Sequence, residues 1–176
     1  MIRFRKRQLK AALTTPLRSR NLLQLGLLLI GLAILLLFIG FKSDFLKVNV
    51  LQKPWQEIVI IVASCLFMPA LCEEIVFRIL FLPHPTENPS IKKQIIWGII
   101  SLTVFIVYHP LQGITWNPVG SEVFMEPIFL ILAALLGVMC TIAYYWVGSL
   151  WLPVFIHWLA VVVWLVLLNG FYQFNY

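Results

Sequence analysis

An apolar run of 20 residues, Leu22 to Phe41, is the feature that most constrains the fold of this chain. As an α-helix, such a run crosses about 30 Å of hydrocarbon. The run is longer than the apolar core of a secretory signal peptide, and the Lys42-Ser43-Asp44 that follows it lacks a small-residue cleavage pattern. We therefore expect a retained transmembrane helix.

The composition of the whole chain also indicates a membrane protein. Of the 176 residues, 61% are hydrophobic and only 11% are charged, whereas soluble domains carry about 25% charged residues. Aromatic residues make up 14% of the chain, which is incompatible with a solvated, disordered coil. The composition thus excludes both soluble and disordered classes.

Four more apolar segments follow the first, separated by polar or proline-rich loops. We predict an all-α fold, a polytopic membrane helix bundle of about five transmembrane helices, with residues 22–176 as one membrane-embedded domain. The third segment is expected to end at Pro110, because proline interrupts helices. The predicted segments are Glu57–Leu82, Ile95–His109, Ile128–Val147 and Leu150–Asn169, with loops at Pro83–Pro89 and Leu111–Pro127.

Residues 1–21 carry a cluster of positive charge with no acidic residue. Beside a transmembrane helix, this pattern indicates a basic cytoplasmic tail attracted to anionic lipid, which gives an N-in orientation. No aromatic or glycine pattern interleaves the charges, so nucleic acid is not expected as a partner. We expect an integral protein of a bacterial inner (plasma) membrane or a related internal membrane. The basic residues are Arg3, Arg5, Lys6, Arg7, Lys10, Arg18 and Arg20.

Two adjacent glutamates, Glu73 and Glu74, and one arginine, Arg78, interrupt the second apolar segment. A charged residue near the middle of a membrane helix costs about 2.5–3.5 kcal/mol on insertion scales. Glu74 and Arg78 have the i, i+4 spacing of a favourable ion pair, whereas Glu73 points about 100° away. One carboxylate is thus predicted to be neutralised and the other left free as a general base. The alternative is a structural ion network that packs helices together.

Two of the three histidines also lie in apolar segments. His109 closes the third segment and His157 lies inside the fifth, whereas His84 is flanked by prolines and is expected to be an incidental loop residue. Counted from the ends of their helices, Glu73 and His157 lie within roughly 3 Å of the same depth. His109 lies about 22 Å along its helix and fits this depth less well. Together, these residues could form an acid–base site or a metal site.

The order and spacing of these motifs resemble the CPBP family, the CAAX-protease and bacteriocin-processing (Abi) membrane proteins. The likeness covers about residues 57–170. It rests on Glu73-Glu74-x-x-x-Arg78, on Phe105-x-x-x-His109, and on His157 after the segment Gly148–Pro153.

This resemblance implies a glutamic-type intramembrane endopeptidase that uses no metal or other cofactor. Glu73 would activate the water, His109 would hold or deprotonate it, and His157 would donate to the oxyanion. Glu74 and Arg78 would be the buried supporting pair. The partners implied are a polypeptide substrate or a membrane protein, within the lipid bilayer.

One position departs from the family pattern. The last motif is commonly HxxxN, but Val161 stands where the asparagine is expected. Loss of one oxyanion donor costs about 10²–10³ in rate. Trp158 and Asn117 are the nearby polar side chains that could replace it. Val161 also leaves open a non-proteolytic alternative, an immunity or self-protection factor or a scaffold for membrane proteins.

Two other functions are less well supported by the sequence. Five spans without an internal repeat argue against a two-fold-symmetric transporter. Glu73, His109 and His157 could supply a two-His-one-carboxylate zinc site, but neither histidine lies in an HExxH arrangement. Three cysteines, at positions 65, 72 and 140, have no CxxC spacing. We therefore predict no metal site.

Overall fold

The computed structural model describes residues 2–16, 22–115 and 117–174, and this part of the chain is helical with no strand. Four segments are long and apolar enough to cross a membrane, and a fifth apolar helix, α8, is shorter. The predicted polytopic helix bundle is therefore confirmed. The four long segments are α2 (Leu22–Lys42), the broken segment Trp55–Glu87, α5 (Ile91–Thr115) and α7 (Pro127–Val147), and α8 spans Trp151–Leu167.

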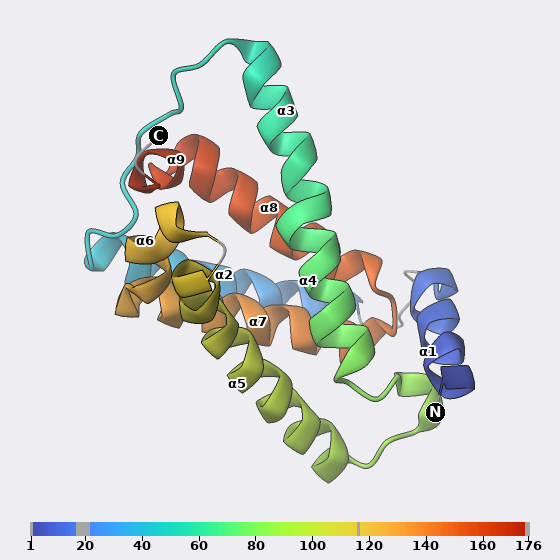
Figure 1. Ribbon diagram of the computed structural model, residues 1–176. Helices are drawn as coiled ribbons and strands as arrows, with labels where there is room; N and C mark the ends of the chain where they lie inside the picture. The colour runs from blue at the N-terminus through green and yellow to red at the C-terminus, as the bar shows by residue number, and fades with distance from the viewer. Residues whose placement is uncertain (1, 17–21, 116, 175–176) are drawn as a thin grey trace.

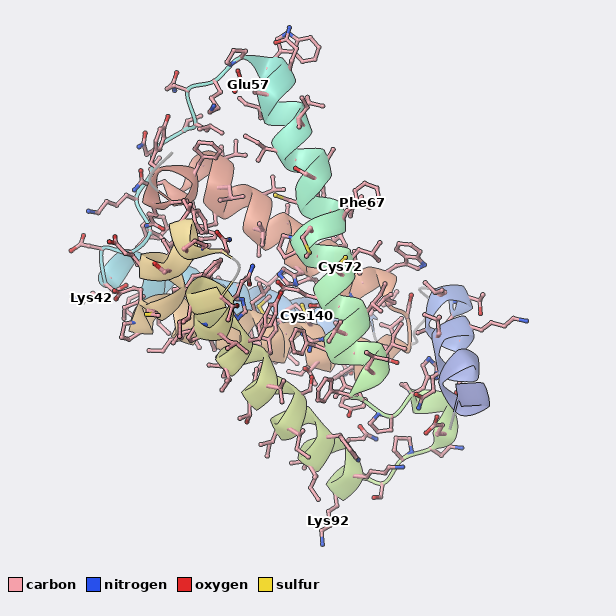
Figure 2. The ribbon with its side chains drawn as sticks, viewed as in Figure 1. Lys42, Glu57, Phe67, Cys72, Lys92 and Cys140 are labelled. Atoms are coloured by element: carbon pink, nitrogen blue, oxygen red, sulfur yellow. The ribbon has the colours of Figure 1, made fainter. Side chains whose placement is uncertain are left out.

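Three of these helices run beside one another and two cross them obliquely. Figure 1 shows α2, α7 and α8 stacked, with the segment that contains α3 and α4 on one side and α5 running away below. In Figure 2, Glu57 near the start of α3 and Lys92 near the start of α5 lie at opposite ends of the molecule. The second and third segments are therefore antiparallel, as the short loop between them requires.

The second segment is a helix interrupted near its middle, as Pro69 predicts. It comprises α3 (Trp55–Cys65), a π-helical stretch η1 (Leu66–Leu71), the short α4 (Cys72–Glu74) and a second π-helical stretch η2 (Ile75–Leu80). At Met68 the backbone leaves the helical region, with φ −134° and ψ 116°. Proline removes a helical hydrogen bond, and wide π-turns accommodate such breaks at functional sites. The two glutamates thus follow directly after a kink.

The predicted end of the third segment at Pro110 is wrong. The helix α5 continues through Pro110 to Thr115, because neighbouring elements support a proline inside a membrane helix. The predicted loop 111–127 is replaced by the last turn of α5, the 3₁₀ turn η4 (Pro118–Gly120) and α6 (Ser121–Met125). A Cβ on Gly113 would come within 2.9 Å of the Ser121 backbone, so this glycine lets α6 pack against the extended helix.

The extended helix accounts for the misfit in the depth of His109. With 25 residues, α5 is about 37 Å long and exceeds the hydrocarbon thickness. Its first turn, with Lys92, projects beyond the neighbouring loop (Figure 2). A helix of this length tilts or projects beyond the bilayer, so residue number along it does not convert directly into depth.

Within the predicted basic tail, residues Ile2–Thr14 form a helix, α1, that docks on the core. Ala12 is fully buried in a cluster with Leu82, Tyr144 and Leu150. The backbone N–H of Leu150 donates to the Ala12 carbonyl (2.9 Å), and Gln8 Nε2 donates to Glu87 (2.6 Å). Arg18 and Arg20 lie outside the described residues.

We expect the substitution Ala12→Phe to release α1 from the core. Overfilling a packed position costs about 1–3 kcal/mol, and Ala12 has no exposed surface to accommodate the larger ring. Limited proteolysis of the purified protein should show faster cleavage between residues 2 and 14. The matched control is Leu9→Phe, because Leu9 is 37% exposed. Equal protection of both variants would contradict the docked position of α1.

Candidate active site

The predicted ion pair between Glu74 and Arg78 is present and buried. Arg78 Nε lies 2.8 Å from Glu74 Oε2, and both side chains are at most 1% exposed. The guanidinium also donates to the Gly137 carbonyl of α7 (3.4 Å). Its Cζ lies 5.9 Å from the centre of the Phe105 ring of α5. Arg78 therefore connects three segments of the bundle through a charge that has no access to water.

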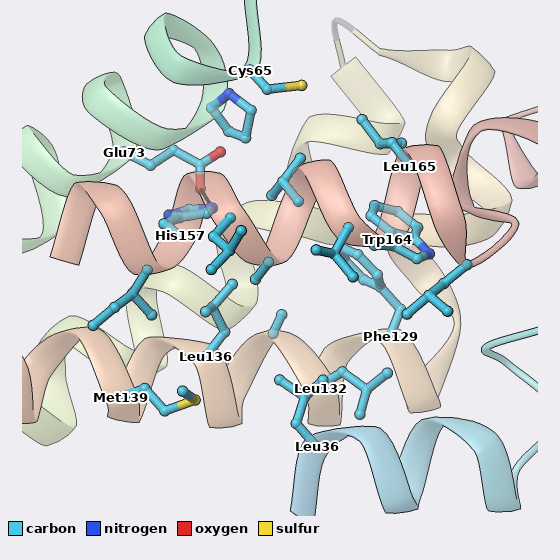
Figure 3. A pocket seen from close by; sticks show the side chains of 18 of the residues that line it. Leu36, Cys65, Glu73, Phe129, Leu132, Leu136, Met139, His157, Trp164 and Leu165 are labelled. Atoms are coloured by element: carbon cyan, nitrogen blue, oxygen red, sulfur yellow. Dashed lines mark ion pairs between the residues drawn. The ribbon is translucent and has the colours of Figure 1, made fainter. Parts of the chain in front are cut away.

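Glu73 is buried but is not part of this pair. Among the described residues, its Oε2 has no hydrogen-bond partner, and Nε2 of His157 lies 3.8 Å from it. Figure 3 shows Glu73 and His157 pointing toward one another at one end of a cavity. The structure thus separates the two carboxylates: Glu74 pairs with Arg78, and Glu73 does not.

His157 bridges the two glutamates from α8. Its Nδ1 lies 2.9 Å from Glu74 Oε1, while Nε2 faces Glu73. Because Glu74 is ion-paired, its oxygen accepts a hydrogen bond from Nδ1–H, and Nε2 is directed to the free carboxylate. The similar depths estimated for Glu73 and His157 are consistent with this contact. The bond between His157 and Glu74 had no signal in the sequence.

His109 reaches the same cavity from α5. Its Nδ1 lies 2.8 Å from the Phe105 carbonyl, and a carbonyl can only accept, so Nδ1 carries the proton and Nε2 is an acceptor. The ring packs edge-on against Phe105 and Phe129, with centroid distances of 4.7 and 5.3 Å. The Phe105 ring in turn lies 6.2 Å from the His157 ring. The structure thus brings all three predicted catalytic residues to one cavity.

This cavity has a volume of about 920 Å³ and is mainly apolar. Its walls come from α2, α7, α8, the second segment and α5, and Trp164 and Phe129 lie toward the end away from Glu73 (Figure 3). Its polar lining includes Glu73, His109, His157, Gln112 and Asn117. A site of this kind presents a few polar groups to an otherwise apolar ligand.

Of the two side chains considered as replacements for the missing asparagine, Trp158 is engaged elsewhere. Its Nε1 donates to the Val62 carbonyl at 2.8 Å. Asn117 does line the cavity, as does Val161 itself. Sequence reasoning missed Gln112, which lies one turn beyond His109, because Pro110 was taken as the end of the helix. The i, i+3 spacing from His109 was the signal that could have found it.

The expectation that His84 is incidental is wrong. The ring is 1% exposed, and its Nε2 donates to the Gly148 carbonyl at 2.8 Å. Its Nδ1 accepts from Thr86. This contact joins the proline-rich loop to the turn between α7 and α8. His84 is therefore a structural residue outside the cavity.

For metal binding, the described residues contain no group of three or more His, Cys, Asp or Glu side chains arranged to hold an ion. Glu73 and His157 are in contact, and His109 lines the same cavity. Metal analysis of the purified protein tests the alternative in which Glu73, His109 and His157 bind zinc.

The fold and the site define a polytopic helical membrane protein with paired glutamates and two histidines around an intramembrane cavity. The chain belongs to the type II CAAX prenyl endopeptidase Rce1-like family, whose model matches residues 54–163. This range contains both glutamates, Arg78, His109, His157 and Val161, and it confirms the resemblance to CAAX proteases of the CPBP type. Searches of curated proteins and of solved structures gave no match.

Proposed function

We propose that this protein is an intramembrane endopeptidase that hydrolyses a peptide bond with a water molecule activated by Glu73. The observation that carries the proposal is the buried Oε2 of Glu73, which has no hydrogen-bond partner among the described residues and faces Nε2 of His157 at 3.8 Å in an apolar cavity. Membership in a CAAX endopeptidase family supports peptide hydrolysis as the reaction.

In this mechanism Glu73 takes a proton from the water as its oxygen attacks the peptide carbonyl carbon. His109, with the proton held on Nδ1 by the Phe105 carbonyl, accepts a hydrogen bond from the same water at Nε2. His157, whose Nδ1–H donates to Glu74, carries a second proton on Nε2 and donates it in a hydrogen bond to the carbonyl oxygen. Glu73 then returns the proton to the leaving amine, so the cycle consumes one water and one peptide bond and uses no metal.

The substrate is a polypeptide that reaches the cavity within the lipid bilayer. The family is described as a CAAX prenyl endopeptidase, and an apolar cavity of about 920 Å³ beside Glu73 suits an apolar group attached to the cleaved segment. In the N-in orientation, the basic α1 lies at the cytoplasmic side of a bacterial plasma membrane. The non-proteolytic alternative rested on Val161 alone, and no contact in the structure favours it.

The purified protein, reconstituted in liposomes, is expected to cleave a CAAX peptide and to stay fully active after treatment with a metal chelator. The peptide is supplied with and without an isoprenyl group, and mass spectrometry in H₂¹⁸O identifies the new carboxyl group. Stoichiometric zinc in the preparation, or loss of activity that zinc restores, would show that the mechanism is metal-dependent. Absence of cleavage of every peptide would favour a non-proteolytic function.

A further inference from the structure

Peptide hydrolysis by an activated water places a negative charge on the carbonyl oxygen, and a hydrogen-bond donor beside that oxygen accelerates the reaction. In the proposed function His157 is one such donor, as an imidazolium that carries a proton on each ring nitrogen. On α8, the position one turn after His157 is Val161, which lines the cavity and has no polar atom. A second donor must therefore come from another wall of the cavity.

The carboxamides that line the cavity belong to Gln112 and Asn117, both from the region after His109. The Oδ1 of Asn117 accepts from the Gly120 N–H at 3.3 Å at the start of η4, which fixes the orientation of this carboxamide and leaves only its Nδ2 as a donor. The side chain of Gln112 makes no hydrogen bond within the described part of the chain, although its backbone carbonyl accepts from Asn117. Gln112 is thus a carboxamide with free donors in a largely apolar site.

The packing of the last turn of α5 fixes the direction of Gln112. The next residue, Gly113, is buried against α6, where a Cβ would come within 2.9 Å of Ser121. Adjacent residues on a helix point about 100° apart, so the side that carries Gln112 is turned away from α6. Gln112 and His109, spaced i, i+3, share the side that faces the cavity.

We infer that Gln112 is a catalytic residue whose side-chain N–H groups bind the oxyanion, in the role that Val161 cannot fill. This inference rests on the proposed function. In the step concerned, the water oxygen bonds to the carbonyl carbon, Glu73 takes the water proton and the carbonyl oxygen becomes the anion that Gln112 binds. When the C–N bond breaks, the amine takes the proton from Glu73.

The test is Gln112→Leu, which keeps the approximate volume and removes the donors. We expect a fall in kcat of about 10²–10³ with KM nearly unchanged, because the contact forms mainly in the transition state. Gln112→Glu, which keeps the shape and loses the neutral N–H donors, should be equally slow. The matched control is Gln52→Leu in an exposed loop, whose side chain bonds only to the nearby Val50 carbonyl, and it should retain full activity.

The decisive arm is the double variant Gln112→Leu/Val161→Asn, which moves the donor to α8. The kcat of this double variant should be at least tenfold higher than the kcat of Gln112→Leu. A Gln112→Leu enzyme with unchanged kcat, a loss confined to KM, or a loss that Val161→Asn does not relieve would each overturn the inference.

Glu73→Gln assayed in parallel separates this inference from the proposed function. If the wild-type protein is active and depends on Glu73 while Gln112→Leu is also fully active, the inference alone fails. If the wild-type protein is inactive, or Glu73→Gln cleaves at the wild-type rate, the proposed function fails and the inference with it.

Discussion

The substitution Glu73→Gln is expected to abolish peptide cleavage while the protein still folds. An amide at this position keeps the size of the side chain but cannot take a proton from water. General-base catalysis contributes about 10²–10⁴ in rate, so cleavage should fall by at least that factor. The side chain is buried without an ion pair to Arg78, and replacing an unpaired carboxylate by a neutral amide should leave the bundle intact.

The measurement is the cleavage rate in liposomes beside thermal unfolding of the same preparation. The matched control is Glu57→Gln, because Glu57 is exposed and pairs only with Lys53. We expect wild-type cleavage from the control and wild-type unfolding from both variants. Cleavage by Glu73→Gln at the wild-type rate would refute the mechanism, whatever its effect on stability.

Arg78→Met is expected to have the largest effect on stability of any single change at the site. It removes the partner of a fully buried carboxylate, and breaking one side of a buried ion pair costs about 3–5 kcal/mol. It also removes the donor to the Gly137 carbonyl of α7 and the contact with the Phe105 ring. We expect a large fall in the free energy of unfolding, measured by denaturant titration in detergent micelles.

An exposed pair with the same spacing in this chain provides the comparison. Lys53 and Glu57 are also i, i+4 and lie 2.8 Å apart, but their side chains are 34% and 49% exposed. Lys53→Met should therefore cost about 1 kcal/mol or less. The double variant Arg78→Met/Glu74→Gln should regain part of the lost stability, since it leaves no unpaired charge. Equal costs for Arg78→Met and Lys53→Met would mean that burial does not determine the strength of this pair.

The transmembrane segments and the ion pair could be predicted because each depends on residues close in sequence. Apolar runs set the helices α2 and α7 within a residue or two, and i, i+4 spacing identified Glu74 and Arg78 as partners. Helix rise also gave Glu73 and His157 a similar depth in the membrane, but their contact at 3.8 Å depends on the packing of α8 against the second segment.

The features that the sequence did not predict depend on contacts between distant segments. The helix continues past Pro110 where Gly113 packs on α6, and His84 is buried because Gly148, 64 residues later, supplies an acceptor. The docking of α1 depends in the same way on the start of α8. The sequence pattern around Gln112, His84 and Ala12 does not indicate the distant segments that these residues contact. These positions were therefore predicted to lie in loops or in the tail.

The position of Phe105 has a consequence for how the site can move. Its ring contacts the Arg78 guanidinium and both histidine rings, and its carbonyl holds His109. A rotation of α5 that displaced His109 would also withdraw an aromatic face from a buried cation, which has no solvent to replace it. The positions of His109, His157 and Arg78 are thus coupled through Phe105. Thermal fluctuations of this part of the bundle should therefore be concerted and small in amplitude.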